Sequence, residues 1–271
     1  MTEEFENNRD RRIAFLVDGD NAQPGLVEPM LAEVGRYGTP TIRHIYGDWT
    51  TPNMNGWKQT LHVHAIQPMQ QFRYTTGKNA TDSALIIEAM DILHAGDVSG
   101  FCLVSSDSDY TRLATRIREE GVFVMGIGTK ATPSAFVSAC EVFVYTENLG
   151  VTSEAPAPGP VQEADSREST AADAVRLLST AFQMSVQSDG WASLGVLGNR
   201  LHQLDPGFDP RTYKYRQLSQ MLRAFKEVFE LRERKTKEGA SLISVRLREQ
   251  APDSPAPAGR IRGRSRTTSR P

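Results

Sequence analysis

The sequence predicts an α/β domain built on a doubly wound parallel sheet, followed by a small winged-helix domain and a disordered tail. Three observations predict this. Short, continuously apolar runs alternate with helical patterns over residues 11–149. Three helical patterns and a hairpin follow over 171–249. Two segments of low complexity, 150–170 and 250–271, have compositions that cannot form a core.

The strands of the first domain are predicted from apolar runs rich in β-branched and aromatic residues. Such runs are typical of parallel strands that helices cover on both faces. Crossovers between them are expected to be right-handed. The predicted strands are Ile13–Val17, Thr41–Tyr46, Ala65–Met69, Phe101–Val104, Val122–Ile127 and Val142–Tyr145.

Helical patterns lie between these runs. Pro24 is a favoured first helical residue, and Gly38 and Gly121 stand where a helix is expected to end. The predicted helices are Pro24–Tyr37, Asn53–His62, Ala80–His94, Tyr110–Glu120 and Pro133–Ala139.

The second domain has a different pattern. Three helices are followed by two short strands around a charged turn, which is the order of a winged helix. Trp191 is expected to be a buried anchor of this domain rather than a stacking platform for a base. The predicted elements are helices Ala171–Met184, Trp191–Leu204 and Leu218–Phe225, and strands Val228–Leu231 and Leu242–Leu247.

Pro, Ala, Ser and acidic residues dominate 150–170, which predicts a semi-extended linker. The segment 250–271 is rich in Pro, Ser and Arg and is expected to be a disordered tail that contacts phosphates without sequence preference, or contacts nothing.

The composition favours a cytoplasmic protein. Cys102 and Cys140 lack the spacing of a zinc or redox motif and are expected to be reduced and buried. No apolar run approaches the ~18 residues of a membrane span. The polar N-terminus lacks the apolar core of a signal peptide. No feature of the sequence specifies an oligomeric state.

The formal net charge of −2 is an average over unlike parts. Acidic side chains are in excess over residues 1–170, and basic side chains are in excess over residues 171–271. The near-neutral total therefore does not exclude nucleic acid as a partner. An acidic domain suited to cations is joined to a basic region suited to phosphates.

Acidic residues follow two of the predicted strands. Asp18 and Asp20 follow the first strand, and Asp107 and Asp109 follow the fourth. With a strand order of 3-2-1-4-5, these two turns open into one cleft at the switch point of the sheet, where ligands bind. Asp82 lies near the start of a helix that would lean over the same cleft.

Carboxylates brought together repel one another, and a hard divalent cation relieves the repulsion. We therefore expect Mg²⁺ or Mn²⁺ at this cleft, with a water poised for metal-assisted phosphodiester hydrolysis. Asn21, Lys78 and Ser106 are candidates for contacting the phosphate. The alternative for any one aspartate is a helix cap, and Asp20 and Asn21 suit that role best.

Other chemistries lack their motifs. No glycine-rich phosphate loop follows the first strand, which argues against a dinucleotide enzyme. No GxSxG elbow or Cys–His arrangement is present to support nucleophilic catalysis.

Three motifs carry a family resemblance: IAFLVDGDN, GKNATD and LVSSDSDYTRLATRIREEGVFVMGIG. In this order they resemble the NYN domain, the LabA-like group of the PIN-like ribonuclease superfamily. The resemblance covers about 11–149 and implies a Rossmann-like nuclease fold with metal-dependent ribonuclease activity. It implies acidic metal ligands and catalytic residues at Asp18, Asp82, Asp107 and Asp109.

The second domain resembles the LOTUS or OST-HTH domain through LLSTAF, DGWASLGVLGNRLHQLDPGFDPRTYKYRQLSQMLRAF and ISVRL. That resemblance implies an RNA-binding or adaptor module. Arg211, Lys214 and Arg216 flank Tyr213 and Tyr215, an interleaving that suits phosphate pairing and base stacking. The alternative is that the tyrosines belong to the core and the basic residues are merely solvated.

Our leading hypothesis is a metal-dependent endoribonuclease with a C-terminal RNA-binding module. The second is a non-catalytic RNA-binding or regulatory adaptor, in which the acidic cleft does not support turnover. A third is a phosphatase or a nuclease that acts on DNA with the same fold.

Overall fold

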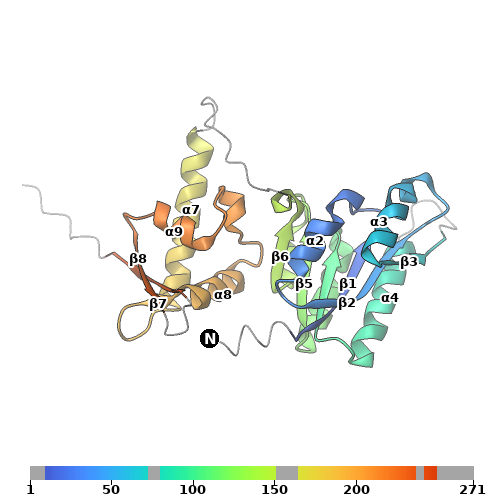
Figure 1. Ribbon diagram of the computed structural model, residues 1–271, viewed down its shortest axis with the longest axis horizontal. Coiled ribbons are helices and arrows are strands. Elements are labelled where there is room, and N and C mark those ends of the chain that lie inside the picture. The colour runs from blue at the N-terminus through green and yellow to red at the C-terminus, as the bar shows by residue number, and fades with distance from the viewer. Residues whose placement is uncertain (1–9, 73–79, 151–163, 236–240, 249–271) are drawn as a thin grey trace, which may run out of the picture.

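The computed structural model describes residues 10–72, 80–150, 164–235 and 241–248, and the statements below concern these residues. They form two domains with separate hydrophobic cores (Figure 1).

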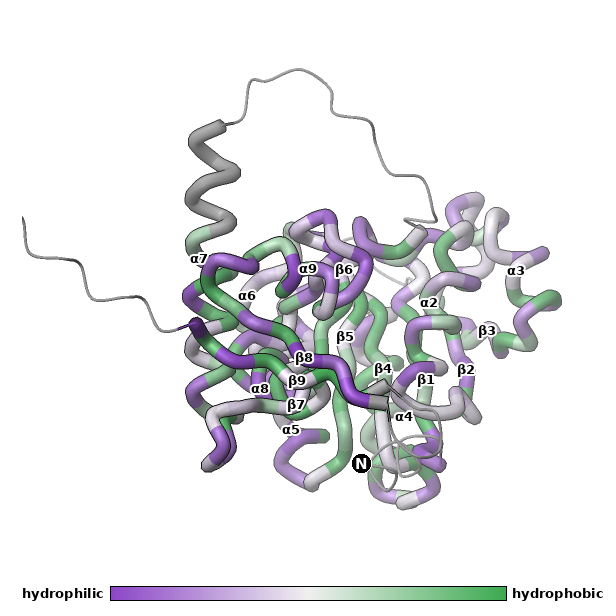
Figure 2. The backbone as a smooth tube through the Cα atoms, turned by 60° about the vertical axis from the view of Figure 1, so that its left-hand side comes forward, coloured by the Kyte–Doolittle hydropathy of each residue, from purple (hydrophilic) through white to green (hydrophobic). Residues whose placement is uncertain are grey.

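The first domain is built on a six-stranded parallel sheet with the order β3-β2-β1-β4-β5-β6. The predicted α/β class and the central order are therefore confirmed, with β6 added at the edge. All five residues of β4 are buried, and the central strands are largely green in Figure 2. The strands are β1 Arg12–Asp18, β2 Thr39–Gly47, β3 Gln67–Gln70, β4 Gly100–Val104, β5 Phe123–Gly128 and β6 Val142–Tyr145.

Helices cover both faces of this sheet. One core packs side chains of α4, α5 and α6 against the sheet, and the other packs α2, Met54 and α3 against the opposite face. The helices are α2 Val27–Val34, α3 Trp57–His64, α4 Ala80–Ala95, α5 Thr111–Glu119 and α6 Ser134–Ala139. Short 3-10 turns are η1 Pro24–Leu26, η2 Pro52–Gly56, η3 Ser108–Tyr110 and η4 Thr146–Asn148.

The second domain packs three helices against a three-stranded antiparallel sheet of order β7-β9-β8. This confirms the predicted winged-helix class. The elements are α7 Ala164–Gln183, β7 Ala192–Ser193, α8 Leu194–Leu204, η5 Pro210–Tyr213, α9 Leu218–Ala224, β8 Phe229–Lys235 and β9 Ser241–Leu247.

Two boundaries in this domain differ from expectation. The helix predicted from Trp191 begins at Leu194, because Ala192 and Ser193 pair with β9 as a short strand. Ser193 then caps α8 by accepting a hydrogen bond from the Val196 N–H. Helix α7 begins at Ala164, inside the segment expected to be linker.

The second domain docks against β6, the edge strand of the first. The Phe143 N–H donates to the Pro206 carbonyl at 2.8 Å. The Asn148 amide donates to the Thr212 hydroxyl at 3.0 Å. An edge strand has unpaired backbone groups, so this contact satisfies one of them within the chain. A cleft of about 660 Å³ remains between the domains, beside Arg11 and His202.

Arg211 is an ionic link across this interface. Its guanidinium contacts Glu33 of α2 at 3.0 Å and Asp209 at 2.7 Å. Burial alone would lower the pKa of Arg211, but hydrogen bonds and attraction from Asp209 and Glu33 raise it above its ordinary value. Glu33 also pairs with Arg36 at 2.6 Å, so the buried carboxylate has two cationic neighbours.

Among the described residues, no helix combines the length and the apolar character that crossing a bilayer would demand.

Replacing Arg211 by Ala is expected to release the second domain from its docked position. The substitution removes charge-assisted hydrogen bonds to Glu33, worth about 1.5–3 kcal/mol. Small-angle scattering should report a larger radius of gyration. Arg216→Ala, which removes an exposed arginine of the same loop, is the matched control and should leave the radius unchanged. An unchanged radius in Arg211→Ala would show that the other interface contacts suffice.

Candidate active site

Asp18 is the last residue of β1 and has no exposed surface. The backbone must turn sharply beyond it: the Gly19 N–H donates to the Tyr46 carbonyl at 2.9 Å. A Cβ at Gly19 would lie 2.8 Å from that same oxygen, so only glycine fits between Asp18 and Asp20. The DGD motif therefore places a carboxylate at the carboxyl edge of the sheet.

Both carboxylate oxygens of Asp18 accept hydrogen bonds. Oδ2 accepts from the Asn21 amide at 2.5 Å and the Ser105 hydroxyl at 3.1 Å, and Oδ1 accepts from the Asp20 N–H at 3.1 Å. Burial raises the pKa of Asp18, the Asn21 hydrogen bond opposes the rise, and the negative charge of Asp82 adds to it. Asp18 is thus a buried anchor of the site.

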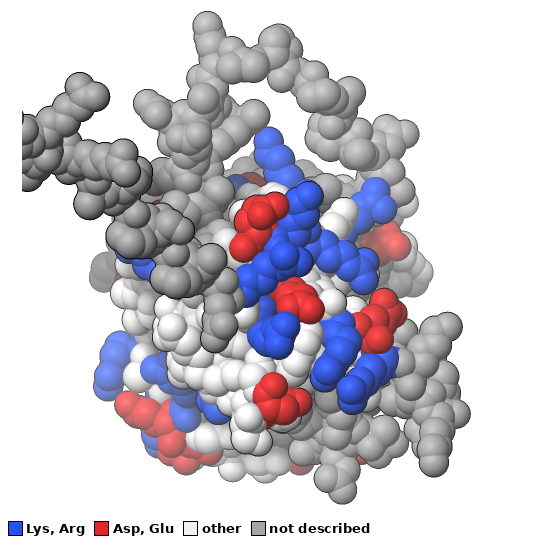
Figure 3. All heavy atoms as spheres, turned by 90° about the vertical axis from the view of Figure 1, so that its left-hand side faces the viewer, with Lys and Arg blue, Asp and Glu red and all other residues white. Residues whose placement is uncertain are grey.

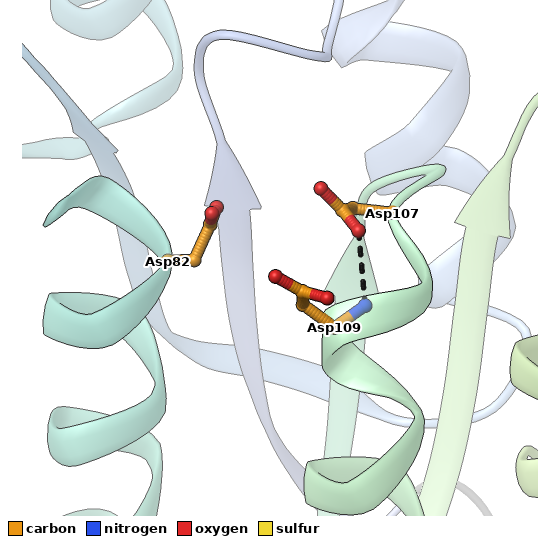
Figure 4. Close-up of side chains that lie close together, drawn as sticks. All are labelled: Asp82, Asp107 and Asp109. Carbon is orange, nitrogen blue, oxygen red and sulfur yellow. Dashed lines mark hydrogen bonds between the residues drawn. The ribbon is translucent and has the colours of Figure 1, made fainter. Parts of the chain in front are cut away.

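Asp107 and Asp109 lie on the turn that follows β4. Asp107 caps η3, and its Oδ1 accepts from the Asp109 N–H at 2.9 Å (Figure 4). The Asp107 N–H donates to the Ser105 hydroxyl at 3.1 Å, while Ser105 donates to Asp18. One serine therefore couples the acidic turn after β4 to the buried carboxylate of β1.

Asp82 comes from the first turn of α4, where a carboxylate also favours the helix dipole. Its Oδ1 accepts from the buried Tyr110 hydroxyl at 2.8 Å. Burial raises the pKa of Asp82, the Tyr110 hydrogen bond lowers it, and the charges of Asp107, Asp109 and Asp20 raise it. Burial is the largest of these causes, and the neighbouring carboxylates add to it.

Three of the four predicted ligands converge. Asp82, Asp107 and Asp109 each offer a carboxylate oxygen, and these oxygens lie within 4.8 Å of one another. Their side chains point into a shared space between α4 and η3 (Figure 4). Asp18 is not part of this group and lies buried beside it. A set of hard oxygen donors with mutual repulsion fits Mg²⁺ or Mn²⁺ chemically.

The predicted phosphate contacts have different surroundings. Asn21 directs its amide to Asp18. The Ser106 hydroxyl accepts from the Thr129 N–H at 2.9 Å, which ties the end of β4 to the loop after β5. Lys78 lies outside the described residues. Asp20, which sequence reasoning ranked below the other aspartates, accepts from Thr81 of α4 at 3.2 Å.

Sequence reasoning missed Tyr110, Ser105 and Thr81 as supporting residues. Each holds an aspartate through a hydroxyl: Tyr110 holds Asp82, Ser105 holds Asp18, and Thr81 holds Asp20. Tyr110 stands directly after the SSDSD motif, which is a usable signal. The hydrogen bond from Tyr110 to Asp82 of α4 depends on how the helices pack, and the spacing of residues in the sequence does not predict it.

The three basic residues of the second domain that are predicted to contact RNA also differ in their surroundings. Arg211 is held by Glu33 and Asp209 at the domain interface. Lys214 and Arg216 are exposed. Lys214 ends η5 in the left-handed region, with φ of 66°. Tyr213 and Tyr215 are partly buried and pack against the core of this domain.

Family comparisons agree with this geometry. Residues 12–149 match the NYN domain, and residues 168–240 match the OST-HTH/LOTUS domain. The chain therefore belongs to the NYN domain family and carries a C-terminal OST-HTH/LOTUS domain. NYN domains are PIN-like nucleases, so the pair of domains supports a nuclease or RNA-binding role. No curated protein matches the chain.

Solved structures resemble parts of the chain. A Vibrio parahaemolyticus protein of unknown function is 19% identical, with a TM-score of 0.43, and the match covers 51% of this chain and 94% of that one. An uncharacterized Nitrosomonas europaea protein is 28% identical, with a TM-score of 0.26, and the match covers 38% of this chain and 95% of that one.

Tyr110→Phe is expected to weaken metal binding by about ten-fold. The ring is retained while the hydroxyl that orients Asp82 is removed, and removal of such an outer partner commonly costs 10–100-fold. Titration with Mn²⁺, followed by calorimetry, measures the change. The apoprotein should lose only about 1 kcal/mol of stability. Equal Mn²⁺ affinity in the variant and the parent would remove Tyr110 from the site.

Asp107→Asn is expected to stabilise the metal-free protein slightly, by less than about 1 kcal/mol. Asparagine keeps the cap of η3 and removes repulsion on Asp82. Thermal unfolding in EDTA should show the gain. Added Mn²⁺ should stabilise the parent protein, by about 2.7 kcal/mol at 100 times Kd, but not the variant. If the variant unfolds at a lower temperature than the parent in EDTA, then Asp107 does not destabilise the metal-free protein through repulsion of Asp82.

Proposed function

We propose that this protein is a metal-dependent endoribonuclease that hydrolyses RNA phosphodiesters, with the OST-HTH domain as its RNA-binding module. The observation that carries the proposal is the convergence of Asp82, Asp107 and Asp109 at the carboxyl edge of the sheet. The membership of the NYN family supports it independently.

Asp82, Asp107 and Asp109 would hold Mg²⁺ or Mn²⁺, one or two ions. A bound cation would supply a polarised water and would offset the negative charge that develops on the phosphate. Asp18 is the fourth acidic residue of the site. It orients the Asn21 amide and the Ser105 hydroxyl by accepting a hydrogen bond from each. Tyr110 fixes the orientation of Asp82.

Asn21, Lys78 and Ser106 remain our candidates for contacting the substrate phosphate. The position of the Asn21 side chain beside Asp18, at the same edge of the sheet, supports this role. In the second domain, Lys214 and Arg216 are exposed and available to RNA. A phosphate would have to displace a carboxylate from Arg211 to reach it. Buried, unbonded Cys102 and Cys140 fit a reducing compartment such as the cytoplasm.

Asp107→Asn is expected to lower the rate of RNA cleavage by at least about 100-fold, because it removes one charged ligand from the metal set. The assay uses end-labelled single-stranded RNA with Mn²⁺ or with EDTA. Asp91→Asn is the matched control: Asp91 lies exposed further along α4, the helix that carries Asp82. Its cleavage rate should equal that of the parent.

Three outcomes would decide against the proposal. Equal cleavage by Asp107→Asn and the parent would remove the acidic group from the chemistry. RNA binding that resists EDTA, without cleavage under either metal, would favour the adaptor. Preferential hydrolysis of competing DNA or of a small phosphomonoester would reassign the substrate.

A further inference from the structure

Two arginines of the second domain lie against the ring of Trp191. The guanidinium carbons of Arg232 and Arg246 lie 4.3 Å and 4.9 Å from the centre of its ring. Trp191 is partly exposed, so it is not the fully buried anchor that the sequence predicts. Two cations within about 6 Å of one indole are well placed for attraction to its π face.

The register of the sheet explains why these arginines share one face. In β8 and β9, Phe229 and Val245 are buried in the core. Strand alternation places Arg232, Arg246 and Arg248 on the opposite, outer face. Arg232 pairs across the strands with Ser244, and Arg246 pairs with Glu230.

This outer face carries an excess of positive charge. The hydrogen bond from Arg246 and the charges of Arg246, Arg248 and Arg232 lower the pKa of Glu230. One carboxylate thus faces three guanidinium groups, and its ion pair within the described part of the chain is with Arg246, at 2.7 Å. Figure 3 shows Lys and Arg side chains grouped on this side of the domain, with fewer acidic ones between them.

Arg232 has unused hydrogen-bonding capacity. Its Nε is buried and has no hydrogen-bond partner among the described residues. A buried guanidinium N–H without an acceptor costs free energy. The Nε itself is covered, so an anionic ligand would be bound through the terminal N–H groups of this partly buried side chain. The indole beside it adds a flat apolar surface.

We propose that Trp191, Arg232 and Arg246, with Arg248 beside them, form a binding face for single-stranded RNA. The arginines contact phosphates, and an unpaired base stacks on the indole or on a guanidinium plane. A base within a duplex cannot reach these planes, so the face selects single strands. This inference rests on the proposed RNA-binding role and places its principal contacts away from the η5 loop that carries Arg211 and Arg216.

The test measures fluorescence anisotropy of a labelled single strand of about 12 nucleotides with the full chain. EDTA is present throughout, so cleavage plays no part. Trp191→Ala is expected to weaken binding about ten-fold, the effect of removing one stacked base. Trp191→Phe should keep most of the affinity. Circular dichroism verifies that each variant is folded.

The arginines are tested by salt dependence. The double substitution Arg232→Ala and Arg246→Ala should weaken binding and reduce the slope of log K against log salt by roughly 0.7 for each phosphate that is no longer neutralised. Arg176→Ala is the control, since Arg176 is exposed on α7, which packs on the inner side of the sheet.

The outcomes separate this inference from the proposed function. Strong binding by the parent with unchanged affinity in folded Trp191 and arginine variants would overturn the face while leaving RNA binding intact. Absence of RNA binding by the parent would overturn both. Equal affinity for a hairpin duplex, or displacement of RNA by an acidic peptide, would overturn the selection of single strands, because the face would then recognise charge alone.

Discussion

The candidate site of the first domain depends on carboxylates that the fold partly buries and brings close together at one edge of the sheet. Asp18 is fully buried, and Asp82 lies within reach of the charges on Asp107 and Asp109. Burial raises the pKa of both Asp18 and Asp82; the charge of Asp82 adds to the rise for Asp18, and the charges of Asp107 and Asp109 add to it for Asp82. Burial and mutual repulsion of these groups cost stability, and a bound cation would offset part of that cost.

Neutral donors limit that cost. Ser105 donates to Asp18 and accepts from the Asp107 N–H, Tyr110 donates to Asp82, and Asn21 donates to Asp18. None of these groups carries a positive charge. The aspartates therefore keep their negative potential while their orientations are fixed, which is the condition for binding a hard cation with defined geometry. A lysine in the same place would have stabilised the fold and closed the site.

Much of this could be predicted from the sequence because it depends on local patterns. Apolar runs predicted the six strands, and the positions of Asp18 and Asp107 at strand ends predicted one acidic edge. The remainder depends on packing between distant segments. The sequence predicts that Arg211, which stands near two tyrosines, contacts RNA. In the structure it forms an ion pair with Glu33 of the other domain. Trp191 looked like core because only the register of β8 and β9 shows that arginines cover it from outside.

The contacts between the two domains fix the position of the basic second domain relative to the acidic first domain. A flexible tether would let the basic face sample every direction relative to the acidic site. Instead, Pro206 and Thr212 bond to β6 and η4, and Arg211 anchors the same loop to α2. These contacts fix the orientation of the winged sheet. Under the proposed function, a bound cation would offset the repulsion between the RNA phosphates and the carboxylates of the first domain.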